Sequence, residues 1–572
     1  MGVAVVVGLL VINSILLSFP GEPKIKRLRF LASAACSFGL FAALCVMLYR
    51  FIVDDAFICL RYGRDLADGF GLVFSTDGSP RIEGCTTFLW TVLAAVPFKL
   101  GLSDDGASHF MKAAGIVFGA GVIGLVGWAG SLAGGSARRG LLAMFAAATV
   151  PYLALWSVGG LESTMYLFWL ALAVCLYLRE AMAHRIRLAS FAVLALAAMT
   201  RPEGAFLTMG LVVWDIGEIL VGWRLGGRAE AAARTKRFLP GLAAFLVIFG
   251  AYYAWRLSYY GYAFPNSFYA KKGTLVMADL IRRGTEILPF LFYVTPLVLL
   301  IALRSISSPR WLVGRASLCL ALGLTACVGF AFVARREWMP GFRYELPILP
   351  FLLPLAVVAG ADVVRRLVAG EMAGENPAPR GKRPAPPGGR RHSAEAAAPA
   401  AGGKAVAVAL LVFGLWGLAP MAQIQTNVQA EDWLGRGHIA VGKWMARWSP
   451  PGASLACADV GAMPYYSRLA RVYDTHWEGL LDLETAHGKY DFWRFVRKEP
   501  TFIVTTVDGD PNAPYKQAQF TNVYTPVFAA AFRSDYILVV WARKDIRFAP
   551  EAMTEARKIQ ANSLTAFRSS RK

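Results

Sequence analysis

Apolar segments long enough to cross a lipid bilayer recur along most of this 572-residue chain. A spanning helix needs about 20 predominantly apolar residues, with a range of roughly 17–25. Hydrophobic residues make up 56% of the sequence, more than is usual for soluble domains. We therefore predict a polytopic α-helical membrane protein with about 11–12 transmembrane helices. The candidate spans are 3–19, 30–52, 108–133, 140–158, 164–178, 188–201, 204–221, 239–257, 286–303, 312–334, 345–363 and 405–421.

Positive charge is concentrated in short clusters between these segments. A formal net charge of +21 is compatible with nucleic-acid binding, but the clustering matches the positive-inside pattern of membrane proteins instead. We therefore place the basic loops in the cytoplasm and the alternate loops on the outer face. The clusters are Lys24–Arg29, Arg138–Arg139, Arg179–Arg187, Arg224–Arg237, Arg304–Arg315 and Arg365–Lys404.

One further apolar segment, 86–101, decides the topology. If it crossed the membrane, Arg138–Arg139 and every later basic cluster would lie outside, against the charge rule. We therefore predict an interfacial helix here, within an outer loop that covers 54–107.

The two ends of the chain differ in character. Segment 3–19 lacks a preceding basic region and a clear cleavage site, so we read residues 1–29 as an extra N-terminal helix followed by a basic cytoplasmic loop. The basic residues that follow this helix favour an N-terminus on the outer side. A transmembrane domain then covers 30–421, interrupted by a cytoplasmic linker at 370–403 that is rich in Pro, Gly, Ala and basic residues and is expected to be disordered.

Beyond the last span, short β-rich runs alternate with helical patterns. This alternation predicts a small α/β domain over 422–572, on the periplasmic or extracellular side. The expected strands are 454–460, 471–474, 502–506 and 536–541, and the expected helices are 432–447 and 483–498.

The acidic pair Asp54–Asp55 stands where the second apolar segment stops. Ionisable groups at a membrane boundary are functional candidates by default, because placing charge there is costly. A carboxylate on the outer face can deprotonate a hydroxyl beside a lipid-borne leaving group. The alternative is that one of the two caps the helix predicted at 56–67.

Other charged residues fall in the same loop or at other outer corners. Arg61 and Glu83 can converge with the acidic pair and bind substrate; the alternative for Arg61 is a structural partner of the pair. Glu162 lies at a helix junction, where it is either a substrate ligand or part of an N-cap. Arg201 precedes a Pro-containing turn and is either a functional cation or part of that turn.

Three more candidates lie further along the chain. Lys271 follows an aromatic-rich stretch and can neutralise phosphate, or it belongs to an interfacial anchor belt. Arg343 can bind a lipid phosphate through its guanidinium, or it extends to the interface as an anchor. His476 lies beside Asp474 in the C-terminal domain and can touch substrate, although a surface role is the alternative.

The eight cysteines are too scattered for a disulfide scaffold or a metal site. Cys59 and Cys85 fall in the same outer loop, so a disulfide between them is one of two alternatives that sequence alone leaves open. The sequence does not identify a metal site.

Several short runs, taken together and in order, resemble the GT-C glycosyltransferases, membrane enzymes that take sugar from polyprenyl-phosphate lipids. The first is Asp54-Asp-Ala-Phe-Ile, and the likeness covers most of 30–480. It is closest to the terminal arabinofuranosyltransferases of mycobacterial arabinogalactan, and protein mannosyltransferases and lipid A aminoarabinose transferases are more distantly similar. Cys59 and Cys85 replace a small residue and a tyrosine in the pattern. The runs are 54–62, 69–74, 83–90, 160–162, 200–204, 260–266 and 338–343.

The resemblance implies a GT-C fold and a catalytic role for Asp54 and Asp55. The expected reaction moves a sugar, with a pentose as the expected sugar, from a polyprenyl-phosphate donor to a cell-envelope glycan or lipid outside the bacterial inner membrane. Asp54 would be the general base, and the cations Arg201, Lys271 and Arg343 would stabilise the departing lipid phosphate. A divalent cation is compatible with this chemistry but is not demanded by it, and no nucleic acid is expected. The rival functions are a lipid or glycan transporter and a non-catalytic subunit of an envelope assembly.

Overall fold

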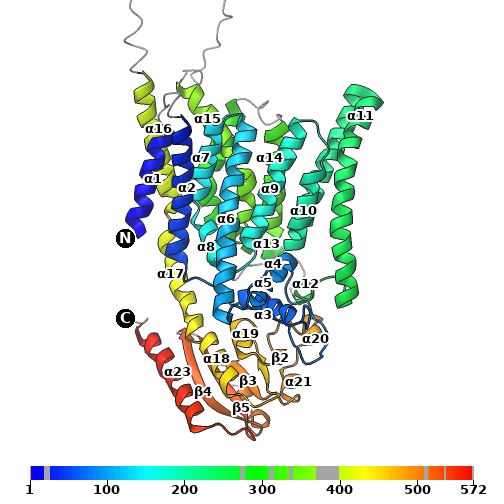
Figure 1. The fold of residues 1–572 in the computed structure, drawn as a ribbon, viewed down its shortest axis with the longest axis vertical. Helices are drawn as coiled ribbons and strands as arrows, with labels where there is room; N and C mark the ends of the chain where they lie inside the picture. Colours follow the sequence, from blue (N-terminus) through cyan, green and yellow to red (C-terminus); the bar gives the residue numbers. More distant parts are fainter. Residues whose placement is uncertain are drawn as a thin grey trace, which may run out of the picture.

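The computed structural model is a bundle of long helices with a small mixed sheet at one end (Figure 1). It describes residues 2–18, 26–270, 277–307, 315–333, 339, 341–368, 398–507, 513–533 and 536–569. Seven described helices are long and apolar enough to cross a membrane, or eight if the bent pair formed by α7 (Ala137–Ala148) and α8 (Pro151–Val158) counts as one span. Shorter apolar helices such as α1 (Gly2–Ser18) and α10 (Leu188–Thr200) complete the bundle.

The helices of the bundle follow the predicted spans closely. They are α2 (Lys26–Leu48), α6 (Asp104–Gly134), α7 (Ala137–Ala148), α8 (Pro151–Val158), α9 (Ser163–Met182), α11 (Glu203–Tyr260), α13 (Met277–Ser307), α14 (Arg315–Val333), α15 (Leu349–Val368) and α16 (Ala398–Leu418). The predicted spans 204–221 and 239–257 are the two arms of α11, which reverses direction at Gly227, where φ is +69°. A positive φ costs glycine little, so the turn falls where the chain has no side chain.

The interior of the bundle is apolar, as expected where helices pack side by side. Leu40 and Phe41 of α2, Val122 of α6 and Phe145 of α7 belong to one buried cluster, together with Trp156 of α8. The predicted linker 370–403 lies largely outside the described residues. Its last residues, 398–403, are helical, because α16 already begins at Ala398 in an alanine-rich stretch.

Segment 86–101 does not cross the bundle, in agreement with the prediction that it is not a span. It forms two short helices, α4 (Phe88–Leu93) and α5 (Val96–Lys99), beside α3 (Ala56–Ala67) at the end of the bundle (Figure 1). Both α2, which ends at Leu48, and α6, which begins at Asp104, meet this same end.

The opposite end of the bundle carries basic clusters. There Arg139 and Arg304 share the carboxylate of Asp362, at 2.6 and 3.2 Å. Arg187 lies 3.5 Å from Asp215 at the same end of the bundle. The basic loops are therefore separated from the sheet by the length of the helices.

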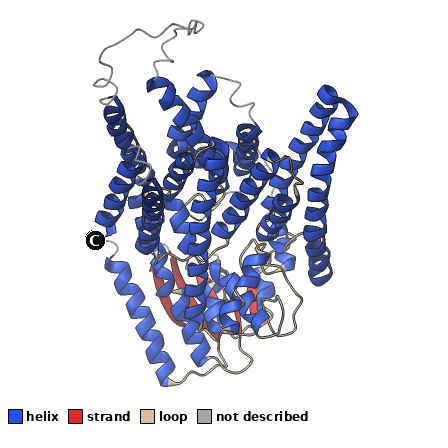
Figure 2. Cartoon of the chain, turned by 45° about the horizontal axis from the view of Figure 1, so that its top comes forward, coloured by secondary structure: helices blue, strands red, loops and turns tan. Residues whose placement is uncertain are grey.

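The C-terminal part folds as the predicted α/β unit. Its five strands are β1 (Ser454–Cys457), β2 (Arg471–Asp474), β3 (Phe502–Thr506), β4 (Tyr524–Arg533) and β5 (Tyr536–Arg543), in the order β2-β1-β3-β5-β4. β1 is parallel to β2 and β3, whereas β5 is antiparallel to β3 and β4. Figure 2 shows the strands as a layer beside the bundle, flanked by helices.

The helices of this unit are mostly short. They are α17 (Met421–Glu431), α18 (His438–Trp448), α19 (Ala462–Ser467), α20 (Leu483–Ala486), α21 (Phe492–Val496), α22 (Ala518–Thr521) and α23 (Pro550–Ser569). The sequence reading missed β4 and α23. β4 carries Pro526 and a run of alanines, which weakens the strand pattern, and its pairing with β5 decides its conformation.

The sheet unit and the first outer loop share one hydrophobic core. Ile58, Tyr62 and Phe74 of the loop belong to the same buried cluster as Trp444 and Leu455 of the C-terminal unit. Ion pairs add to this contact, with Arg468 and Lys443 each 2.9 Å from an aspartate at the start of α6. The C-terminal unit is therefore docked firmly on the loop that carries the acidic pair.

Candidate active site

The carboxylate of Asp54 is held by the C-terminal unit. Its Oδ2 accepts a hydrogen bond from the Gly461 amide at 3.1 Å, and its Oδ1 accepts one from the Ala462 amide at 2.9 Å. A Cβ on residue 461 would overlap the backbone oxygen and the carboxylate of Asp54, so only glycine fits. Burial raises the pKa of the Asp54 carboxyl, which the nearby His438 and the two amides oppose.

Asp55 occupies the N-cap position of α3, but its side chain makes no capping hydrogen bond. Both aspartates are half-buried. The interpretation of Asp55 as an ordinary side-chain cap is therefore wrong, because the carboxylate does not satisfy the first amides of α3. The pair lies between the end of α2 and the start of α3, and Asp54 contacts the docked sheet unit.

Asp459 is a carboxylate that the sequence reading did not single out. Its Oδ2 lies 3.1 Å from Nε2 of His438 and accepts a hydrogen bond from the Tyr536 hydroxyl at 2.5 Å. Burial favours the neutral acid, but the contacts with His438 and Tyr536 hold the pKa of Asp459 below its ordinary value. The sequence placed Asp459 inside the predicted strand 454–460, whereas β1 ends at Cys457. Asp459 therefore lies just after the strand, at the edge where ligands of α/β sheets gather.

Asp474 and His476 lie at the end of the neighbouring strand, β2. The Asp474 carboxylate accepts hydrogen bonds from the amides of His476 and Leu481, at 2.9 and 2.8 Å. Burial raises the pKa of Asp474 to about 7 and lowers the pKa of His476. The structure therefore brings His476 to the same edge of the sheet as Asp459.

Arg61 is buried, with 1% of its surface exposed, and points into the junction between the loop and the C-terminal unit. Its guanidinium donates to the carbonyls of Phe74, Pro464 and Leu469, each at 2.6 Å. Arg61 is therefore surrounded by structural partners, but these are three backbone carbonyls and not the acidic pair that the structural alternative had assigned to it.

Glu83 also has a protein partner. Its Oε2 lies 2.5 Å from Nη2 of Arg256, and both side chains are buried. The backbone carbonyl of Glu83 accepts from the amide of Asn266, whose side chain donates to the carbonyls of Gly479 and Leu480 at 2.8 Å. Glu83 therefore links the first outer loop to Arg256 of α11 and, through Asn266, to the C-terminal unit.

Glu162 and Arg201 form a buried ion pair between two helix corners. Nη1 of Arg201 lies 3.0 Å from Oε1 of Glu162, and Nη2 lies 2.9 Å from Oε1 of Glu203. Glu203 stands inside the Arg201-Pro-Glu-Gly motif but was not picked out from the sequence. The Arg201 guanidinium also lies over the ring of Tyr344, 5.2 Å from its centre.

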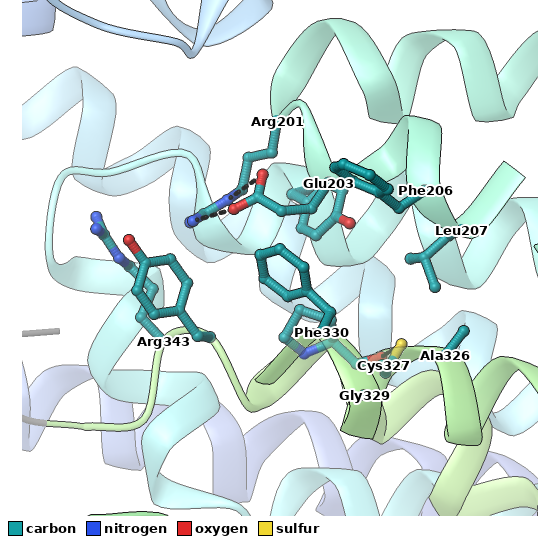
Figure 3. A pocket seen from close by; sticks show the side chains of 12 residues that line it. Arg201, Glu203, Phe206, Leu207, Ala326, Cys327, Gly329, Phe330 and Arg343 are labelled. Atoms are coloured by element: carbon teal, nitrogen blue, oxygen red, sulfur yellow. Dashed lines mark hydrogen bonds and ion pairs between the residues drawn. The ribbon is translucent and has the colours of Figure 1, made fainter. Parts of the chain in front are cut away.

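A cavity of about 340 Å³ opens beside this ion pair (Figure 3). Arg201, Glu203 and Arg343 line one part of it, and the remaining wall is largely apolar and includes Phe206 and Phe330. Arg343 lies over the rings of Trp156 and Tyr344, 5.5 Å from each centre. The cavity therefore combines cations with an apolar wall.

A backbone hydrogen bond connects the segment that carries the acidic pair with the segment that leads to Glu162. The amide of Val53 donates to the carbonyl of Gly159 at 3.3 Å, three residues before Glu162. Residue 160 packs against Ala56, and Trp90 donates from its indole to the carbonyl of Gly160 at 3.0 Å. The first loop and the Glu162–Arg201 corner are thus parts of one region.

The arrangement of the whole chain is similar to known structures. ArnT from Cupriavidus metallidurans bound to undecaprenyl phosphate is 14% identical, with a TM-score of 0.53, covering 91% of this chain and 98% of that chain. ArnT from the same organism in the apo state is also 14% identical, with a TM-score of 0.55, covering 88% of this chain and 97% of that chain. Residues 422–557 match a family model described as "Domain of unknown function (DUF8728)". No curated protein matches the sequence.

This chain has the GT-C fold. The likeness extends over both the helical bundle and the C-terminal unit, because 91% of the chain is covered. It confirms the predicted fold class. The more specific likeness to terminal arabinofuranosyltransferases stays a prediction.

Two further sequence-based interpretations of the site concern Lys271 and the pair Cys59 and Cys85. Lys271 lies outside the described residues. Cys59 and Cys85 are free thiols, so of the two alternatives left open by the sequence the disulfide is not the one formed in this structure. The Cys59 thiol lies 3.3 Å from the Thr87 hydroxyl, and a hydrogen bond with Cys85, followed by burial, raises the pKa of Cys59.

In the described part of the GT-C fold, no group of three or more His, Cys, Asp or Glu side chains is arranged to hold a metal ion. Asp54 and Asp459 approach each other closely enough for their charges to interact, but their contacts are with amides, His438 and Tyr536.

Proposed function

We propose that this protein is a membrane glycosyltransferase. It would move a sugar from a polyprenyl-phosphate donor to a cell-envelope glycan or lipid on the outer side of the bacterial inner membrane. The GT-C fold supports the enzyme class, and the ArnT structure that holds undecaprenyl phosphate supports a lipid carrier of this kind. The basic clusters at the end of the bundle away from the sheet support an outward-facing site.

One observation carries the proposal most directly: Val53, next to Asp54, is hydrogen-bonded to Gly159, three residues before Glu162. The Glu162 carboxylate is in turn paired with Arg201, which lines the cavity. A transferase with a lipid donor needs a base for the acceptor and a cationic pocket for the departing phosphate, close together at a membrane surface. The acidic pair directly precedes α3, which lies at the end of the bundle that the C-terminal unit covers.

In the proposed reaction, Asp54 is the general base. Its carboxylate takes the proton of an acceptor hydroxyl while that oxygen bonds to the anomeric carbon of the donor sugar. The bond between the anomeric carbon and the phosphate oxygen breaks, and polyprenyl phosphate leaves. The amides of Gly461 and Ala462 orient the base, and Asp55 binds sugar hydroxyls beside it.

The lipid phosphate would occupy the polar part of the cavity. Arg343 contacts it directly, and Arg201, balanced by Glu162 and Glu203, holds the corner in place. Lys271 would supply further positive charge. The isoprenoid would run along the apolar wall that includes Phe206 and Phe330.

The donor sugar is proposed to be a pentose, with arabinofuranose the first candidate, because the runs in the first loop resemble terminal arabinofuranosyltransferases. The acceptor would then be an envelope polysaccharide.

Reconstitution into proteoliposomes with polyprenyl-phospho-arabinofuranose, labelled in the sugar, tests the proposal. The wild type should transfer label to envelope glycan. Asp54→Asn should lower the rate by about 10²–10⁴-fold, the usual contribution of a general base. Asp545→Asn, which alters an exposed aspartate of the C-terminal unit, is the matched control and should transfer at the wild-type rate.

Transfer by correctly folded Asp54→Asn and Asp55→Asn at the wild-type rate would refute this mechanism. The remaining interpretations would then be a lipid or glycan transporter and a non-catalytic subunit of an envelope assembly. A panel of other polyprenyl-phosphate sugars tests the choice of sugar separately from the enzyme class. Activity with a hexose donor alone would overturn the pentose proposal and leave the glycosyltransferase proposal standing.

A further inference from the structure

The orientation and solvent exposure of Asp459 suit a ligand-binding carboxylate. His438, with 4% of its side chain exposed, and Tyr536 both contact Oδ2, while 28% of the Asp459 side chain stays exposed. A carboxylate that is fixed by buried neighbours and still reaches solvent is pre-organised for hydrogen bonding. The proposed reaction does not use this group.

The position of Asp459 in the sheet supports a binding role. β1 and β2 run parallel, and Asp459 and Asp474 stand at their carboxyl ends. In open α/β sheets, ligands bind at this edge. The same turn continues to Gly461 and Ala462, whose amides bind Asp54, so a ligand on Asp459 would lie beside the proposed base.

Trp477 adds an exposed aromatic face to the same edge. Its side chain is 59% exposed, and its ring lies 5.4 Å from the ring of His476. The loop that carries it is anchored at both ends, by Asp474 at His476 and Leu481, and by Asn266 at Gly479 and Leu480. A large aromatic side chain on a firmly held loop is a typical anchor for a ligand.

We propose that Asp459 and Trp477 form the acceptor subsite and that they bind a neutral, hydroxyl-rich glycan. The carboxylate accepts hydrogen bonds from sugar hydroxyls, and the indole packs against the C–H face of a sugar ring. Asp54, Asp55 and Asp459 make the region acidic, which disfavours a phosphorylated or sulfated acceptor. This inference rests on the proposed glycosyltransferase function, and it assigns the acceptor side of the site to the C-terminal unit.

Saturation-transfer NMR on the full-length protein in lipid nanodiscs, free of sugar detergents, tests the subsite. The probes are short neutral arabinan, galactan and mannan fragments, each with a sulfated counterpart. We expect at least one neutral fragment to bind. Trp477→Ala and Asp459→Asn should each raise the Kd of this fragment by about tenfold or more, as expected for an interface anchor.

The matched controls are Trp223→Ala, because Trp223 is 57% exposed on α11, and Asp545→Asn. Both should bind as the wild type does. Trp477→Phe should keep most of the affinity, because it retains an aromatic face, and it serves as the folding control. In the transfer assay, Trp477→Ala should raise KM for the bound fragment about tenfold and change kcat much less.

Three results would overturn the subsite: no neutral fragment binds the wild type, the variants bind as tightly as the wild type, or the sulfated fragments bind more tightly. Normal sugar transfer by both Trp477→Ala and Asp459→Asn would refute the subsite proposal while leaving the glycosyltransferase proposal supported. If the wild type binds a fragment but transfers no sugar, and both variants lose this binding, the glycan-binding site is supported and the glycosyltransferase proposal is refuted.

Discussion

The carboxylate of Asp54 accepts a hydrogen bond from the amide of Gly461 at 3.1 Å, although 407 residues separate the two in the chain. This contact joins the first outer loop to the turn after β1. It makes the C-terminal unit part of the site rather than an appended domain.

Gly461→Ala should therefore impair the site while leaving the bundle folded. An added Cβ overlaps the Asp54 carboxylate, so either the turn or the carboxylate must move. A displacement of about 1 Å at a catalytic group can lower the rate about 100-fold. The transfer assay measures this, with Gly435→Ala as control, because a Cβ at 435 meets open space. Equal rates for the two variants would argue against a role for the contact.

Breaking the ion pair between Arg201 and Glu162 should destabilise the corner between α10 and α11. Arg201→Gln leaves Glu162 and Glu203 buried without their cation, which typically costs about 3–5 kcal/mol. Thermal unfolding in nanodiscs measures the loss. Arg234→Gln on the exposed α11 hairpin, which also breaks two carboxylate contacts but at a more exposed site, should cost much less. A comparable loss in both variants would contradict the buried placement.

Glu83 and Arg256 should behave as a coupled pair. Either Glu83→Gln or Arg256→Gln leaves one charge buried and unpaired, whereas the double variant removes both charges. We expect the double variant to be more stable than the sum of the single effects predicts, in a double-mutant cycle followed by unfolding. Strict additivity would mean that Glu83 acts through a partner other than Arg256.

Asp474 should make the stability of the C-terminal unit fall as pH rises. Burial raises its pKa to about 7 in the folded protein, whereas an exposed aspartate has a pKa near 3.9. Between these values the folded state binds more protons than the unfolded state, so stability declines by up to about 1.4 kcal/mol per pH unit. His476 has an opposite trend, because burial lowers its pKa.

The difference between wild type and Asp474→Asn isolates the first effect. The variant cannot ionise at 474, so its stability relative to wild type should rise from pH 4 to pH 7 and be level above that range. Unfolding curves at several pH values measure this difference. A difference that does not change with pH would mean that Asp474 is ionised in the folded protein.

The sequence was sufficient for those features that depend on local composition. Apolar length and the basic loops predicted the helices, and the charge rule kept 86–101 at the end of the bundle, where α4 and α5 lie. The strand patterns at 454–460 and 502–506 likewise led to β1 and β3, because alternation with helices is visible in the chain.

The partners of charged side chains could not be predicted in this way. Arg61 looked like a substrate ligand, but three carbonyls from distant segments surround it. Asp459 has no charged neighbour in the local sequence, and its partners His438 and Tyr536 come from distant elements. These contacts link residues far apart in sequence, and no local pattern records them.

The sequence by itself determined the helical membrane architecture and the presence of an acidic pair at an apolar boundary, because burial of apolar segments in lipid depends on length and composition. Only the tertiary structure decided that the carboxylate of Asp54 meets Gly461 and that Arg201 meets Glu162, at 3.1 and 3.0 Å. Hydrogen bonds and ion pairs require distances of about 3 Å between atoms, and only the folded packing of the loop, the helix corners and the docked sheet brings them that close.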